Sequence, residues 1–338
     1  MTLQLASPPS AIALHDLITS QRITAVIYVA ARLGVADCLA GGAMSLSELV
    51  QETGAHERSL RRLLRALVTL GICKQVGKDQ FELTAVGSHL AGGASQSLKH
   101  WALMETELMP RLWGSLFDTV RAGKNPTTAD EYFEKMTPEI AKTFDQAMVE
   151  ITGMVIPDVL AAYDFSGITR LIDVGGGRGQ LLSAILDAYP LMRGTVFDLP
   201  RCAEAAKKQL ADARVSDRSK FIGGSFFESV PDGADALVLK SVIHDWDDEQ
   251  SSKILDNCHR ALPKSGRLLL VERLIPEIPK TNPDHCSIAL SDLQMLVLGG
   301  GACERTEGEF RELLSKSRFR MARVQPAGRY NVIEATVA

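Results

Sequence analysis

The sequence predicts an α/β fold in which a Rossmann-like domain with a seven-stranded sheet follows a helical, winged-helix-like domain. Strand and helix patterns alternate over residues 166–338, as in a doubly wound parallel sheet. A glycine-rich turn follows the first of these strands at 175–179. Two strand patterns in succession, 319–325 and 330–337, close the chain and predict an antiparallel edge on the parallel sheet.

The composition is that of an ordinary globular chain. Its 338 residues are enough for two domains, and 46% of them are hydrophobic, which allows a sizeable core. A net charge of −4 argues against a general nucleic-acid or membrane-surface binder. No apolar stretch reaches the length of a membrane span, no basic segment opens the chain, and the six cysteines are scattered without a Cys-x-x-Cys pair. We therefore expect a cytoplasmic protein with reduced thiols and no metal site.

Residues 1–95 predict a domain of helices that ends in a β-hairpin. The stretch 12–39 is helical in pattern and apolar on most faces. A helix that is apolar all round is usually buried, and in a terminal segment we expect a partner chain to bury it. Ser45 and Glu48 fit a capping box at the start of the next helix.

A third helix and the hairpin give this domain the order of a winged helix. Leucines recur at helical spacing over 56–70, and the opposite face carries four arginines. Strands at 72–76 and 80–83 form the hairpin. One interpretation is DNA recognition by the arginine helix, and the other is an interaction domain of the same shape. Lys78 at the hairpin tip lies beside an aspartate and the chain is acidic, so the sequence favours the interaction domain.

Residues 96–165 predict a helical segment rich in large apolar side chains. Most of these side chains are expected in the core. Methionines are adaptable packers, however, and can shape a pocket for a flat organic ligand. We expect a minority to contact substrate: Trp101, Met104 and Met148.

The patterns in residues 166–338 define the predicted sheet. Five apolar strands alternate with helices, and a last helix precedes the two closing strands. The predicted strands are 170–173, 194–198, 219–223, 236–240 and 267–272, and the predicted helices are 180–188, 200–211, 249–262 and 307–317.

A glycine turn lies between the first of these strands and its helix. Glycines let the backbone approach a ligand closely, and a helix N-terminus offers free N–H groups and a positive dipole end. Such a turn suits the polar part of a nucleoside cofactor. Asp173 precedes the turn, and Asp198 ends the next strand, where a carboxylate can accept hydrogen bonds from both ribose hydroxyls. These two features fit NAD and S-adenosylmethionine alike, whereas seven strands with a terminal hairpin favour S-adenosylmethionine.

Three later segments place chemistry at the same end of the sheet. His244 follows the fourth strand, in the crevice where open α/β sheets bind ligands. Glu272 ends the fifth strand, and Glu304 lies in a glycine-rich segment before Arg305-Thr306. We expect the aspartates after the histidine to cap the next helix rather than to bind a metal: Asp245, Asp247 and Asp248.

The ordered set of motifs resembles one enzyme family. Four motifs follow one another: Gly-Gly-Gly-x-Gly (175–179), Phe-Asp-Leu-Pro (197–200), His-Asp-Trp (244–246) and Gly-Gly-x-x-Glu-Arg-Thr (300–306). The chain thereby resembles the class I S-adenosylmethionine-dependent O-methyltransferases, and among them the caffeate and hydroxyindole type with its bacterial natural-product branch. The resemblance covers nearly the whole chain. It implies a winged-helix-like dimerisation domain, a substrate-pocket region and a class I methyltransferase domain, over residues 1–95, 96–165 and 166–338.

The resemblance also assigns roles to positions. It implies that His244 is the general base and that Glu272 and Glu304 bracket it. It implies a cofactor site made of Asp173, Gly175, Gly176, Gly177, Gly179, Asp198, Leu199, Gly224, Ser225, Phe226 and Lys240. Ser225 and Phe226 stand where the plant members have Asp-Met, and they can still hydrogen-bond and pack against adenine. The expected substrate contacts are Trp101, Met104, Met148, Asp245, Asp292 and Met295.

A base is needed because the acceptor must lose a proton. A phenol has a pKa of about 10, so ionising it at pH 7 costs roughly 4 kcal/mol. A neutral imidazole with a pKa of about 6.5 is mostly available at pH 7 and contributes about 10²- to 10⁴-fold. A glutamate would orient the ring and stabilise the imidazolium. We therefore expect a homodimeric O-methyltransferase for a phenolic or enolic hydroxyl of a small aromatic molecule.

Three alternatives remain open from the sequence. Carbon methylation uses the same fold, with His244 deprotonating an activated carbon. A relative could keep the cofactor and have changed or lost methyl transfer. A transcription regulator would use the winged helix on DNA. Asp292 also has two interpretations, a substrate contact or a hydrogen bond to the backbone.

Overall fold

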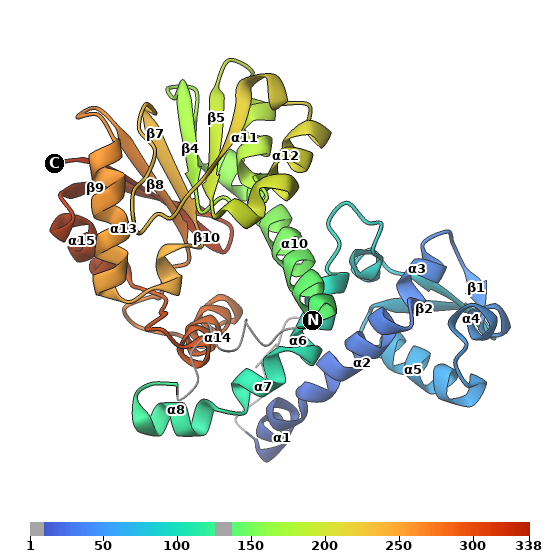
Figure 1. Cartoon of the computed structure of the whole chain (residues 1–338). Coiled ribbons are helices and arrows are strands. Elements are labelled where there is room, and N and C mark those ends of the chain that lie inside the picture. The colour runs from blue at the N-terminus through green and yellow to red at the C-terminus, as the bar shows by residue number, and fades with distance from the viewer. Residues whose placement is uncertain (1–9, 126–136) are drawn as a thin grey trace. The chain divides into compact units, whose positions relative to one another are not determined.

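The computed structural model describes residues 10–125 and 137–338 and divides the chain into two compact units. The units are Met1–Leu112 with Lys135–Ile151, and Trp113–Glu134 with Thr152–Ala338. Figure 1 shows the order of the elements along the chain. Helix α10 (Pro138–Ala162) contributes to both units, and the seven-stranded sheet lies in the second.

The long helix expected over 12–39 is divided at Ser20 and Gly34. Gly34 has a φ of +69°, a left-handed conformation that separates two helices. The Ser20 hydroxyl donates to the Leu17 carbonyl at 2.8 Å and so competes with the helical hydrogen bonds. The elements up to residue 113 are α1 (Ala11–Thr19), α2 (Gln21–Arg32), α3 (Val35–Leu39), β1 (Met44–Ser45), α4 (Leu46–Thr53), α5 (Glu57–Thr69), β2 (Cys73–Gly77), β3 (Gln80–Leu83), η1 (Gly87–Leu90), α6 (Lys99–Glu107) and α7 (Met109–Trp113).

The predicted capping box and hairpin are confirmed. Ser45 Oγ accepts from the Glu48 N–H at 3.2 Å, and the Glu48 carboxylate accepts from the Ser45 N–H at 2.7 Å. Strand β2 pairs antiparallel with β3, and β1 joins the other edge of β3. Leu60, Leu64 and Leu67 of α5 are buried, so the leucine stripe faces the core of this unit.

The second unit contains the predicted α/β sheet. Its strand order is β6-β5-β4-β7-β8-β10-β9, with β10 antiparallel to both of its neighbours and the other pairs parallel. The strands are β4 (Arg170–Val174), β5 (Arg193–Asp198), β6 (Ser219–Gly223), β7 (Ala236–Lys240), β8 (Arg267–Glu272), β9 (Phe319–Ala327) and β10 (Tyr330–Val337). The sheet and its antiparallel edge are as predicted, except that β9 reaches Ala327 and leaves Gly328-Arg329 as the turn.

Helices cover both faces of this sheet. Leu171 of β4 packs with side chains of α10, α11 and α12, whereas Ile172 packs with those of α13 and α15. Neighbouring side chains of a strand point to opposite faces, so the two helix sets lie on opposite sides, as Figure 1 also shows. The helices are α11 (Gln180–Ala188), α12 (Ala203–Asp212), α13 (Asp248–Ala261) and α15 (Glu307–Lys316).

The strand order reverses between β4 and β7. From β4 the chain continues to β5 and β6 on one side, and β7 and β8 follow on the other. In open α/β sheets, ligands bind outside the carboxyl ends of the strands at such a switch point. Asp173, Asp198, Lys240 and Glu272 all lie in the last two residues of their strands. The fold therefore gathers these predicted site residues at one edge of the sheet.

Helix α14 (Pro283–Leu298) is not among the predicted helices. Asn282 caps it by accepting the His285 N–H at 2.8 Å, and Pro283 occupies its first position. The helix contacts α8 (Leu116–Ala122) and carries the predicted residues Asp292 and Met295. Among the described residues, no helix is long and apolar enough to cross a membrane.

Candidate active site

The turn after β4 requires glycine for reasons of space and conformation. A Cβ on Gly176 would lie 2.6 Å from the Cγ of Asp173, which is closer than such atoms can approach. Gly177 and Gly179 have φ values of +54° and +76°, and Gly179 is the N-cap of α11. The Gly177 N–H donates to Asp198 Oδ2 at 2.7 Å, which ties the turn to the end of β5.

The Asp198 carboxylate is fixed by backbone donors. In addition to the Gly177 N–H on Oδ2, its Oδ1 accepts from the Leu199 N–H at 2.6 Å. A carboxylate has about four lone-pair sites, and the Cys202 thiol also donates to Oδ1 at 3.5 Å, so acceptor capacity remains on Oδ2. The arrangement leaves Asp198 able to accept from the hydroxyl donors of a ligand beside the glycine turn.

Two ionisable groups, the buried Asp173 and the half-buried Lys240, lie at the carboxyl ends of β4 and β7. Asp173 Oδ2 has no hydrogen-bond partner among the described residues. Burial raises the pKa of Asp173 to about 7, although the charge of Lys240 opposes the shift. Burial likewise lowers the pKa of Lys240, against the charges of Glu272 and Asp173. An unpartnered carboxyl beneath a turn of glycines suits a ligand that brings a cationic N–H donor.

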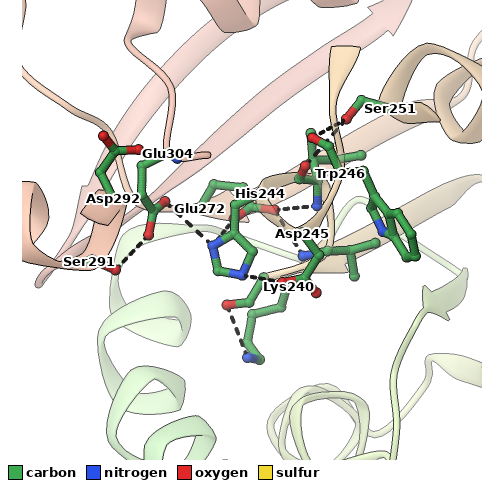
Figure 2. A network of polar contacts seen from close by, with 12 residues as sticks. Lys240, His244, Asp245, Trp246, Ser251, Glu272, Ser291, Asp292 and Glu304 are labelled. Carbon is green, nitrogen blue, oxygen red and sulfur yellow. Dashed lines mark hydrogen bonds and ion pairs between the residues drawn. The ribbon is translucent and has the colours of Figure 1, made fainter. Parts of the chain in front are cut away.

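His244 lies between two buried carboxylates (Figure 2). It belongs to the short turn η4 (Ile243–Asp245) that follows β7. Its Nδ1 lies 3.4 Å from Glu304 Oε2 and 3.6 Å from Glu272 Oε2, and its Nε2 lies 3.5 Å from Asp245 Oδ1. The His244 side chain is 13% exposed, and those of the two glutamates are 0% and 1% exposed.

The charge around His244 overturns one expectation from the sequence, a neutral imidazole at pH 7. Burial alone lowers the pKa of this imidazole. The charges of Glu272, Asp245 and Glu304 outweigh burial and raise the pKa to about 10. Without a ligand the ring is therefore protonated at pH 7, and it becomes a base only when this proton is lost.

Glu272 also holds the backbone of the histidine turn. Its Oε1 accepts from the N–H groups of Val242 and Ile243 at 3.0 and 2.9 Å. Its Oε2 faces His244 and forms no hydrogen bond with the described residues. One carboxylate thus fixes the start of the turn with one oxygen and faces the ring with the other.

Glu304 is oriented by helix α14. Its Oε1 accepts from the Ser291 hydroxyl at 2.7 Å, and its N–H donates to Asp292 Oδ1 at 3.0 Å. Burial raises the pKa of Glu304, but the interactions with His244 and the hydrogen bond from Ser291 outweigh burial, and the pKa is lowered. Asp292 thus accepts a hydrogen bond from the backbone, which is one of the two roles that the sequence left open for it.

An aromatic cluster lies beside the glycine turn. Phe226, Phe227 and Trp246 meet edge to face, with ring centroids 4.7–6.0 Å apart. Phe226 lies close to the turn, because a Cβ on Gly175 would be 3.7 Å from its Cε1. Ser225 Oγ accepts from the Phe227 N–H at 3.3 Å, and its own hydrogen remains available to a ligand.

The remaining predicted residues have different surroundings. Asp247 caps α13 by accepting the Gln250 N–H at 2.8 Å, as predicted, and Asp248 lies in the first turn of that helix. Asp245 is not a cap, since its carboxylate faces His244 Nε2. Trp101, Met104 and Met148 lie in the first unit and Met295 in the second, and their substrate contacts stay predictions.

Two residues that gather at the site had no predicted role. Ser291 orients Glu304, and Arg305 is buried against the histidine turn. Only Arg305 had a signal in the sequence, because an arginine directly after a site glutamate is a candidate for burial in an ion-pair network.

Comparison with known proteins gives a consistent result. Residues 113–320 match the model of an O-methyltransferase domain, and residues 15–93 match that of an O-methyltransferase dimerisation domain. Phenazine O-methyltransferase PhzM of Lysobacter antibioticus is 39% identical over 98% of this chain and 97% of that one. The mitomycin biosynthesis 6-O-methyltransferase of Streptomyces lavendulae is 38% identical over 93% of this chain and 90% of that one.

Solved structures extend the similarity to a protein with its cofactor bound. Human N-acetylserotonin methyltransferase in complex with S-adenosylmethionine has a TM-score of 0.87 and 27% identity, over 98% of this chain and 99% of that one. Two relatives carry other names. An 8-amino-8-demethylriboflavin N,N-dimethyltransferase of Streptomyces davaonensis is 32% identical over 91% of this chain and 89% of that one. The aclacinomycin 10-hydroxylase RdmB of Streptomyces purpurascens is 33% identical over 89% of this chain and 82% of that one.

Proposed function

The chain belongs to the O-methyltransferase family and is an S-adenosylmethionine-dependent methyltransferase, and we propose that its acceptor is a phenolic or enolic hydroxyl of a small aromatic molecule of natural-product type. We further propose that His244 is the general base. One observation carries the role of the histidine. Its Nδ1 lies between two buried glutamates, and its Nε2, with the Asp245 carboxylate 3.5 Å away, is the nitrogen that would take the proton of the acceptor.

The residues present fit the cofactor. The unpartnered Asp173 carboxyl beneath the glycine turn suits its amino group, and Asp198 suits its ribose hydroxyls. The other residues that would hold it are Gly175, Gly176, Gly177, Gly179, Leu199, Gly224, Ser225, Phe226 and Lys240. When bound, S-adenosylmethionine supplies a methyl group on a positively charged sulfur.

The histidine cluster would remove the acceptor proton. The acceptor O–H donates to Nε2, while Glu272 and Glu304 hold Nδ1–H and stabilise the imidazolium that results. In the ligand-free protein the pKa of His244 is about 10, so the ring must first lose its own proton to solvent before Nε2 can accept that of the acceptor.

A screen of acceptors tests this function. The enzyme is incubated with S-adenosylmethionine and a panel of aromatic hydroxyl compounds, and products are detected by a mass gain of one methyl. We expect at least one hydroxyl compound to gain a methyl on oxygen. Methylation on carbon or nitrogen, or cofactor binding without any transfer, would favour the alternatives that the dimethyltransferase and hydroxylase relatives keep open.

Replacement of Asp198 tests the cofactor site. Asp198→Ala removes two charge-assisted hydrogen bonds to ribose, each worth about 1.5–3 kcal/mol. Calorimetry should show a Kd for S-adenosylmethionine at least about tenfold weaker than in the wild type, whereas the exposed Asp187→Ala should leave it unchanged. An unaltered Kd for Asp198→Ala would exclude this assignment.

We further propose a homodimer formed through the dimerisation domain. Helix α1 has no buried residue, and Ile12, Leu14 and Ile18 are 72%, 59% and 65% exposed. Large apolar side chains gathered on one short helix with no buried residue mark an interaction site. We expect these side chains to be buried against a second copy, in an interface above the standard size of about 1,600 Å².

Light scattering tests the dimer. The wild type should be dimeric at micromolar concentration, and Leu14→Glu with Ile18→Glu should shift it to monomer because two buried charges would be unpaired. Leu191→Glu is the matched control, since Leu191 is 95% exposed in the other unit. A monomeric wild type would disprove the proposal.

A further inference from the structure

Arg305 is buried beside the turn that carries His244. Its side chain is 3% exposed and pairs with Asp248 at 2.9 Å. Burying a guanidinium is costly unless its donors are hydrogen-bonded, so the groups that it binds show what it holds.

The guanidinium binds the backbone on both sides of His244. Its Nη1 donates to the Ile243 carbonyl at 3.1 Å, and its Nη2 donates to the Trp246 carbonyl at 2.8 Å. Its Nε and Nη2 also donate to Asp248 Oδ1, at 3.1 and 2.9 Å. The planar, five-donor head of arginine can make these bonds together, whereas a lysine ammonium cannot.

Neighbouring residues of the same segment hold His244 as well. The Cys303 N–H donates to the His244 carbonyl at 2.9 Å, and the Glu304 carboxylate faces Nδ1 at 3.4 Å. The Arg305 carbonyl accepts from the Ile275 N–H at 3.0 Å, which anchors the segment to the chain after β8. Three consecutive residues thus contact His244 or the backbone on either side of it.

The hydrogen bonds within the histidine turn are weak. Within it, the Asp245 N–H reaches the Val242 carbonyl at 3.2 Å and the Trp246 N–H reaches the Ile243 carbonyl at 3.3 Å, and short 3₁₀ turns have poor hydrogen-bond geometry. Glu272 binds the N–H groups at the start of the turn, whereas Arg305 and Ser251 lie on the carbonyls of Ile243 and Trp246. Glu272 and Arg305 thus hold opposite kinds of backbone group in the same turn.

We propose that Arg305 is a positioning residue for His244: by binding the carbonyls before and after the histidine, it sets the orientation of the imidazole between Glu272 and Glu304. The inference rests on the proposed role of His244 as the base. The Arg305 side chain is 3% exposed and its guanidinium is engaged by the two carbonyls and by Asp248, so Arg305 acts through the turn that carries His244.

Arg305→Lys tests the proposal, because lysine keeps the positive charge but lacks the planar, five-donor guanidinium. We expect kcat to fall at least tenfold, with the KM for acceptor and the Kd for S-adenosylmethionine within about twofold of the wild type. In the ligand-free protein, the pKa of His244 measured by NMR should move down from about 10 toward its ordinary value. Arg318→Lys is the matched control, because Arg318 is 57% exposed and pairs with Asp256 at the surface.

A second variant keeps the test valid if Arg305→Lys does not fold. Ser251 Oγ lies 3.3 and 3.2 Å from the same two carbonyls, of Ile243 and Trp246, which share its one hydrogen. Ser251→Ala should therefore shift the pKa of His244 in the same direction by a smaller amount.

A double-variant cycle separates this inference from the proposed function. Arg305→Lys should cost almost nothing further in a His244→Asn background. If the two losses multiply, or if the NMR titration of His244 is unchanged in both variants, the positioning role is wrong. If His244→Asn itself loses no activity, the base role fails, while the NMR titration still reports whether Arg305 orients the ring.

Discussion

Replacing His244 with asparagine is expected to lower kcat by about 10² or more, the usual contribution of a positioned base. The Kd for S-adenosylmethionine should stay within about twofold of the wild type, because the imidazole faces the acceptor side and the cofactor residues are left in place. Turnover is measured with the best acceptor from the screen, and the Kd by calorimetry. His259→Asn is the matched control, since His259 packs on Phe319 at 5.4 Å between ring centroids and has no part in the cluster.

Substitution of Glu272 is expected to have the second large effect, on stability as well as on rate. Glu272→Leu leaves the buried N–H groups of Val242 and Ile243 without their acceptor. At about 1–3 kcal/mol for each unsatisfied group, the free energy of unfolding should fall by roughly 2–6 kcal/mol. The kcat should fall by about 10² or more, because the turn that carries His244 is released.

Glu272→Gln is the matched variant for this prediction. Its amide oxygen can still accept from both N–H groups, so the free energy of unfolding should fall much less than in Glu272→Leu. The lost charge should lower the pKa of His244, since Glu272 is the largest of the groups that raise it. Equal destabilisation by the two substitutions, measured by urea unfolding, would show that the backbone hydrogen bonds contribute little to the free energy of unfolding.

The strands of the sheet could be predicted because a buried parallel strand is apolar along its whole length. The runs 236–240 and 267–272, which are buried except at one end, have the bounds of β7 and β8. Helix α14 gave no such signal, since its apolar residues are spread around the helix and leave no stripe at helical spacing. The break at Gly34 was missed because the apolar pattern continues through it.

The candidate site was predictable as a set of residues and not as an arrangement. The motif order indicated His244, Glu272 and Glu304, and the structure brings all three together. The protonation state of His244 could not be derived, because it depends on three carboxylates from separate segments and on burial. The contacts of Ser291 and Arg305 depend likewise on tertiary structure, which places α14 and the 303–305 segment against the histidine turn.

The most direct test of the base role compares acceptors of different acidity. The ratio of wild-type to His244→Asn turnover is measured for a series of phenols, with the methyl located on the product oxygen. The ratio should be about 10² or more for a phenol with a pKa of about 10, and should approach one for an acceptor with a pKa of about 7, which ionises without help. High pH should likewise restore part of the loss with the weaker acid. The same ratio for every acceptor at every pH would show that His244 positions the substrate and does not take its proton.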